Sequence, residues 1–185
     1  MNIILEKFNV DGFRLINNLA GHNIWLDKFM IFAADQMGYV LIISVLILFW
    51  KKDYFKNVVL VSWGSAIIAR LVFVGLMRYL IYSPRPFLVL ENVNRLVNHE
   101  FESSFPSGHT TFYFALAMGV YLYNKKVGRI YLVLAGLMGF SRIYVSVHWP
   151  LDILAGIVLG IGTAIIVNYL VNYLKQKMPR RTFMG

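Results

Sequence analysis

The sequence predicts an all-α protein, a polytopic bundle of five or six transmembrane helices preceded by an interfacial helix at the N-terminus. Of its 185 residues, 58% are hydrophobic and 15% are charged, whereas a soluble domain carries about 25% charged residues. Apolar runs of the length that crosses a bilayer recur along the chain, and polar residues gather between them. The length suits one helical bundle, so residues 1–185 are expected to form a single membrane-embedded domain.

The first 36 residues are expected to form interfacial or partly inserted helices. Residues 1–20 mix charged and apolar side chains, a pattern typical of an amphipathic helix lying at the membrane surface, and Gly21 ends it. Residues 23–36 include Asp27, Lys28 and Asp35 and are too polar to cross a bilayer by themselves. They form either a second interfacial helix or the lower part of a long first span.

Five apolar segments follow, and each is predicted to span the membrane. Their approximate bounds are 37–50, 57–82, 106–123, 129–146 and 150–174. Pro84 and Pro86 end the second segment, because proline lacks an amide proton and clashes with the preceding turn. Ser107 is expected to cap the third segment, and Pro150 opens the last one at a favoured first helical position. Residues 57–174 are the predicted catalytic core.

The net charge of +9 is concentrated in three basic clusters, each at the end of an apolar run. The clusters contain Lys51, Lys52 and Lys56; Lys125, Lys126 and Arg129; and Lys175, Lys177, Arg180 and Arg181. This distribution indicates a positive-inside bias and not a nucleic-acid-binding surface. It predicts a multi-pass protein of the cell membrane with its active site on the outer side. Trp25, Trp50 and Trp149 fit interfacial anchors.

Three separated motifs contain the residues best suited to handle a phosphate group. They are Arg78-x6-Arg85-Pro86, Pro106-Ser107-Gly108-His109 and Ser141-Arg142-x5-His148-x3-Asp152. Arginine grips phosphate oxygens in a bidentate manner and stabilises the charge on them during phosphoryl transfer, so Arg78, Arg85 and Arg142 are candidate phosphate ligands. A helix that begins at Ser107, with Gly108 allowing close backbone approach, offers a natural anion site.

His148 and Asp152 are four positions apart at the mouth of the last predicted helix. This spacing lets the carboxylate accept a hydrogen bond from one ring nitrogen, which leaves the other nitrogen to attack phosphorus. The same pair could instead be half of a metal site, although no convincing partner ligands accompany it in the sequence.

The three motifs resemble those of the type 2 phosphatidic-acid phosphatase superfamily, whose pattern is Lys-x6-Arg-Pro, Pro-Ser-Gly-His and Ser-Arg-x5-His-x3-Asp. Every fixed position matches except Arg78, where the family usually has lysine. The resemblance covers about residues 57–170. It implies a phosphohistidine intermediate on His148, a proton donor in His109, and a reaction that needs no metal or other cofactor.

The same resemblance implies a lipid phosphate or diphosphate as substrate, within the bilayer. Short members with this arrangement resemble bacterial undecaprenyl-diphosphate phosphatases, and this is the preferred interpretation. A phosphatidylglycerophosphate or phosphatidate phosphatase would use the same site, and a non-enzymatic anion carrier is the alternative from another class. Arg70, deeper in the second predicted span, is interpreted as pairing with a buried acceptor such as Asp35, or alternatively as a second phosphate contact.

Overall fold

The structure, a computed structural model, describes residues 3–98 and 103–177. Helices account for most of these residues. The N-terminal part contains α1 (Ile3–Asn17), α2 (Ile24–Asp35) and α3 (Met37–Phe49). One long helix follows, built from α4 (Phe55–Ile68), the π-helical segment η1 (Ala69–Phe73) and α5 (Val74–Leu80). After the short α6 (Pro86–Val89), the bundle is completed by α7 (Gly108–Tyr123), α8 (Lys125–Tyr144) and α9 (Pro150–Lys177).

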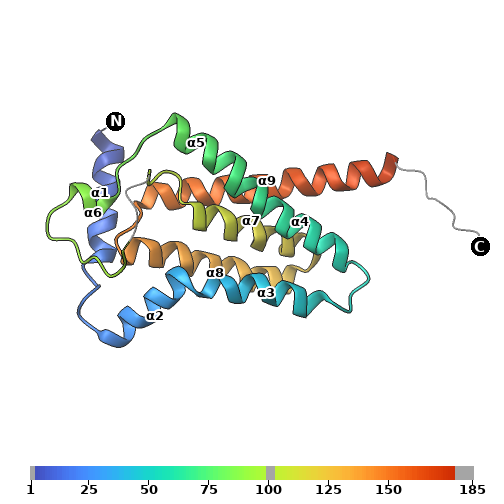
Figure 1. The fold of residues 1–185 in the computed structure, drawn as a ribbon, viewed down its shortest axis with the longest axis horizontal. Coiled ribbons are helices and arrows are strands. Elements are labelled where there is room, and N and C mark those ends of the chain that lie inside the picture. The colour runs from blue at the N-terminus through green and yellow to red at the C-terminus, as the bar shows by residue number, and fades with distance from the viewer. Residues whose placement is uncertain (1–2, 99–102, 178–185) are drawn as a thin grey trace, which may run out of the picture.

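The central helix of the bundle is α7, which packs against α4, α8 and α9 (Figure 1). Its side chains from Ala115 to Ala117, together with Val120, have no exposed surface. By contrast, Leu71, Val133 and Val158 on the surrounding helices expose at least 70% of their surface. An enclosed apolar centre within an apolar outer surface is the arrangement expected of a helical bundle in a bilayer.

Three helices within the described residues are long and apolar enough to cross a membrane, namely Phe55–Leu80, Lys125–Tyr144 and Pro150–Lys177. The helices α2 and α3 qualify as a fourth only when taken together, and they are bent by 54° at the break between them. The 16 residues of α7 extend about 24 Å, less than the roughly 30 Å of a hydrocarbon core. The structure thus gives three or four candidate spans, fewer than the five or six predicted from sequence.

Two glycines let α9 approach the beginning of α7 closely. A Cβ atom on Gly160 would lie 2.5 Å from the carbonyl oxygen of Thr111, and one on Gly156 would lie 3.1 Å from that of Ser107. Their spacing is the small-x-x-x-small pattern that permits tight packing of membrane helices. These glycines therefore set how near the first turns of α7 lie to α9.

The ends of the bundle differ in charge. Figure 1 shows the α3–α4 turn, the α7–α8 turn and the end of α9 towards one end, whereas the α5–α7 and α8–α9 connections lie at the other. The first group carries the basic clusters predicted from sequence, apart from Arg180 and Arg181, which lie outside the described residues. The second group carries the three motifs.

The helix α1 lies across the end of the bundle that carries the motifs, roughly perpendicular to the long helices (Figure 1). The side-chain oxygen of Asn9 accepts a hydrogen bond from the amide of Leu151 at 3.0 Å. The amide of Asn17 donates to the carbonyl of Tyr144 at 2.8 Å. The predicted interfacial helix is therefore also bonded directly to α8 and α9.

One of the three predicted tryptophan anchors is buried. Trp25 and Trp50 are exposed, as expected, but Trp149 is only 7% exposed. Its Nε1 donates to the carbonyl of Pro84 at 2.8 Å, and its ring lies 5.5 Å from that of Phe13. The prediction was wrong for Trp149, because α1 covers the loop that carries this residue.

Candidate active site

The pairing of His148 with Asp152 is present as predicted. Nδ1 of His148 lies 3.2 Å from Oδ2 of Asp152, and the two side chains are 1% and 2% exposed. The histidine lies on the buried α8–α9 connection, two residues before α9 begins at Pro150 as expected, and Asp152 lies in the first turn of that helix. With Nδ1 directed at the carboxylate, the opposite ring nitrogen, Nε2, is directed away from it.

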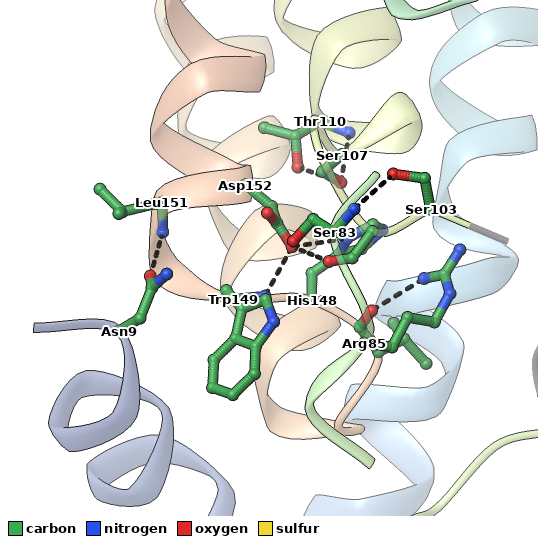
Figure 2. A network of polar contacts seen from close by, with 12 residues as sticks. Asn9, Ser83, Arg85, Ser103, Ser107, Thr110, His148, Trp149, Leu151 and Asp152 are labelled. Atoms are coloured by element: carbon green, nitrogen blue, oxygen red, sulfur yellow. Dashed lines mark hydrogen bonds and ion pairs between the residues drawn. The ribbon is translucent and has the colours of Figure 1, made fainter. Parts of the chain in front are cut away.

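Asp152 is the centre of a buried polar network (Figure 2). Its Oδ2 also accepts a hydrogen bond from the backbone amide of Trp149 at 2.8 Å and another from the hydroxyl of Ser104. Sequence reasoning missed Ser104, which has no exposed surface and lies just before the second motif. These contacts hold the carboxylate in one orientation, so it can fix the orientation of the His148 ring.

Backbone bonds bring the three motifs to one place. The amide of Ser104 donates to the carbonyl of Ser83 at 2.8 Å, and the amide of Ser83 donates to the hydroxyl of Ser103 at 3.2 Å. These bonds tie the segment that precedes Arg85 to the segment that precedes α7. The amide of Ser107 donates in turn to the carbonyl of Asp152 at 3.1 Å, which ties the start of α7 to the start of α9.

Arg78, on α5, and Arg85, the residue before α6, lie close to the pair formed by His148 and Asp152. Arg85 has no exposed surface, and its Nη1 donates to the carbonyl of Val147, the residue before His148, at 2.8 Å. Arg78 is half-buried on α5, close enough for its charge to act on both Asp152 and Arg142. The structure therefore gathers the first and third motifs around the same carboxylate.

Arg142 is held from one side by α2. Its Nη1 lies 2.8 Å from Oδ1 of Asp35 and 3.4 Å from the carbonyl oxygen of Ala34. The guanidinium is 1% exposed, and its Nε and Nη2 have no hydrogen-bond partner among the described residues. Buried donors of this kind are costly unless they are satisfied, so they suit a ligand rich in acceptors such as phosphate.

The start of α7 forms as the sequence predicted. Ser107 is the N-cap, and its hydroxyl accepts hydrogen bonds from the amide of Thr110 at 3.5 Å and from the Thr110 hydroxyl at 3.0 Å. Gly108 is the first helical residue, so the amide groups of the first turn face the end of the bundle where the arginines lie. A helix N-terminus with the positive end of its dipole directed there favours an anion.

His109 is half-buried in the first turn of α7, with its ring 6.4 Å from that of Tyr113. Arg70 lines a cavity beside His109. The carboxylate of Asp35, which was the expected partner of Arg70, pairs with Arg142 instead. That expected pairing was wrong because Arg70 projects from the π-helical segment towards α7, whereas Asp35 ends α2 beside α8.

The metal half-site alternative receives no support from neighbouring side chains. Among residues 3–98 and 103–177, no group of three or more His, Cys, Asp or Glu side chains is placed to hold a metal ion. The described side chains instead combine an oriented imidazole, a second histidine and several guanidinium groups. Chemically, this set can bind a tetrahedral oxyanion, attack it and supply a proton.

Several known proteins are similar to this chain in sequence or in fold. The chain is 37% identical over 163 residues to the bacitracin transport permease protein BcrC of Bacillus licheniformis, covering 88% of this chain and 80% of that protein. It is 35% identical over 164 residues to the undecaprenyl-diphosphatase BcrC of Bacillus subtilis, with 88% and 81% covered. The crystal structure of Aquifex aeolicus LpxE superposes with a TM-score of 0.71 at 36% identity, covering 86% of this chain and 93% of that one. A match to the PAP2 superfamily extends over residues 59–176 and includes all three motifs, so the chain belongs to the PAP2 superfamily.

Proposed function

We propose that the protein is an integral membrane lipid phosphatase that hydrolyses undecaprenyl diphosphate to undecaprenyl phosphate and inorganic phosphate. The observation that carries the proposal is the buried contact of 3.2 Å between His148 and Asp152, with Arg78 and Arg85 of the first motif beside it. Membership of the PAP2 superfamily supports hydrolysis of a phosphate ester or anhydride. The relative named undecaprenyl-diphosphatase supports the choice of lipid.

The first chemical step transfers the terminal phosphoryl group to the enzyme. Nε2 of His148 attacks phosphorus, and the bond between that phosphorus and the bridging oxygen breaks. His109 gives its proton to the departing oxygen, so undecaprenyl phosphate leaves. Asp152 stabilises the positive charge that develops on the His148 ring, while Arg78, Arg85 and Arg142 bind the phosphoryl oxygens.

The second step releases phosphate from the phosphohistidine. His109, now neutral, takes a proton from a water molecule as that water attacks phosphorus. The phosphorus–nitrogen bond breaks, and its electron pair returns to Nε2 of His148. Both histidines regain their starting protonation states, so the cycle is closed by the side chains alone.

Orientation follows from the charge difference between the ends of the bundle. The positive-inside rule assigns the end with the basic clusters to the cytoplasm, so the candidate site lies on the outer side of the cell membrane. A Lys125→Cys variant tests this, because the native chain contains no cysteine. The thiol should resist an impermeant maleimide in intact cells and react after permeabilisation. Labelling of intact cells would reverse the proposed topology.

Two other functions make different predictions. A phosphatidylglycerophosphate or phosphatidate phosphatase would use the same residues but should prefer a glycerophospholipid to a polyprenyl diphosphate. A non-enzymatic anion carrier has no need for an oriented histidine–carboxylate pair, and it should move phosphate across vesicles even after His148→Ala.

The test is phosphate release from undecaprenyl diphosphate by detergent-purified protein in the presence of EDTA. Wild type should turn over, His148→Ala should be inactive while still binding the lipid, and His22→Ala, an exposed histidine on the α1–α2 connection, should match wild type. Faster turnover of phosphatidylglycerophosphate would favour the glycerophospholipid alternative. Activity retained by His148→Ala would refute the proposed nucleophile.

A further inference from the structure

Arg70 occupies an unusual position in the membrane-spanning part of the structure. It lies near the middle of the long helix Phe55–Leu80, within the π-helical segment Ala69–Phe73. A charged side chain at this depth is costly unless it pairs with another group or faces a polar cavity. Short π-helical segments inside α-helices occur frequently at functional sites, because the extra residue redirects the side chains around it.

The guanidinium of Arg70 lies directly against the Pro-Ser-Gly-His motif. A Cβ atom built on Gly108 would lie 2.6 Å from Nε and 2.7 Å from Cζ of Arg70. The space that a side chain at position 108 would fill is therefore taken by Arg70. Gly108 therefore makes room for the Arg70 guanidinium, and it also leaves the first turn of α7 accessible to an anion.

Arg70, Gly108 and His109 line one cavity of about 220 Å³, whose remaining lining residues are Ile42, Phe112 and Tyr113. The cavity is thus cationic where it meets the start of α7 and largely apolar elsewhere. An anionic group attached to a hydrocarbon chain would match both parts.

The proposed reaction indicates which anionic group would occupy the cavity. His109 gives its proton to the oxygen that departs with the lipid. In a diphosphate, that oxygen belongs to the second phosphate, which stays on the product. A phosphate bonded to the oxygen at His109 and directed away from His148 would enter the cavity beside His109, where Arg70 can bind two of its oxygens.

We propose that this cavity is a second phosphate subsite in which Arg70 binds the phosphate retained by the lipid, so that Arg70 selects diphosphates over monophosphates. The inference rests on the proposed function and adds the residue that determines its substrate class. The apolar part of the cavity, at Ile42 and Phe112, receives the first carbons of the prenyl chain.

The test compares farnesyl diphosphate with farnesyl monophosphate, which differ only in the second phosphate. With Arg70→Gln, kcat/KM for the diphosphate should fall about 100-fold, the size of a lost charge-assisted bidentate contact, while kcat/KM for the monophosphate stays within about threefold. Arg129→Gln, the same change at an exposed position on α8, should leave both substrates unaffected. If the glutamine variant fails to elute as a folded species, Arg70→Lys, which keeps the charge but not the fork, should show a smaller selective loss.

Inhibition of monophosphate hydrolysis provides a second measurement. Inorganic pyrophosphate should inhibit wild type more strongly than orthophosphate, and Arg70→Gln should remove this difference. Equal losses on both farnesyl substrates, or no loss on either, would overturn the inference while leaving the proposed function intact. A selective effect on pyrophosphate inhibition alone would assign the subsite to free pyrophosphate and overturn its role for the lipid. Failure of wild type to hydrolyse any polyprenyl diphosphate would instead refute the proposed function, and the lipid subsite with it.

Discussion

Replacing Asp152 with asparagine should lower kcat while leaving substrate binding almost unchanged. The amide oxygen can occupy the place of Oδ2 and still accept from Trp149 and Ser104, so the local geometry and the His148 tautomer are preserved. What is lost is the negative charge 3.2 Å from the ring nitrogen of His148.

The decrease in kcat can be worked from the distance between the two charges, which are spread over the ring and the carboxylate and so lie slightly farther apart than the contacting atoms. Two unit charges about 4 Å apart interact by about 4 kcal/mol at an effective dielectric constant of about 20. If half of the positive charge on the ring has developed in the transition state, the loss is about 2 kcal/mol, which corresponds to a decrease in kcat of about 30-fold. KM should stay within about threefold, because the phosphate is held by the arginines and not by this carboxylate.

Steady-state kinetics in detergent would separate kcat from KM, and an alkaline quench of labelled substrate would measure the phosphoenzyme. Asp53→Asn, an exposed carboxylate on the α3–α4 turn, is the matched control. A change in kcat below about threefold, or a loss confined to KM, would refute the assigned electrostatic role of Asp152.

Three further predictions concern charge, packing and pH. Asp35→Asn keeps an acceptor for Arg142 but removes its counter-charge. Because Asp35 is 41% exposed, the pair is expected to contribute only about 1 kcal/mol to stability, so the unfolding temperature in detergent should fall by about 3 °C, and an unchanged unfolding temperature would contradict the role of the pair. Gly160→Ala should lower the unfolding temperature in detergent, because the added Cβ would lie 2.5 Å from the Thr111 carbonyl oxygen. The control Gly162→Ala should be neutral or stabilising, because its Cβ would meet nothing within 4 Å. Equal changes in unfolding temperature for the two variants would count against this packing. Since one histidine must be neutral and the other protonated, kcat/KM should be bell-shaped in pH, and activity still rising well above about pH 8 would exclude that assignment.

Features set by neighbouring residues were predictable from the sequence. Ser107 caps α7, and Pro150 opens α9, because both preferences act within one helical turn. The contact between His148 and Asp152 follows from their spacing of four positions at a helix start. In each case the residue type and its immediate neighbours contain the necessary information.

Contacts between distant segments could not be predicted in this way. Asp35 and Arg142 are 107 positions apart, and Ser104 and Asp152 are 48 apart, so no local pattern links them. The burial of Trp149 depends on how α1 lies across the bundle end. Hydropathy records that α7 is apolar, but it does not show that this helix has only 16 residues or that it is enclosed by α4, α8 and α9.

The distribution of charge in the site connects the proposed reaction with Arg70. The first turns of α7 and α9 meet at one end of the bundle, with Arg78, Arg85 and Arg142 around them. The carboxylates of Asp152 and Asp35 offset part of this positive charge. The remaining positive charge suits a single terminal phosphate. A diphosphate brings additional negative charge beyond the bridging oxygen, and the proposed subsite assigns this charge to the cavity that Arg70 and His109 line. Removing that cation should therefore weaken the preference for two phosphates over one without impairing attack on the terminal phosphorus.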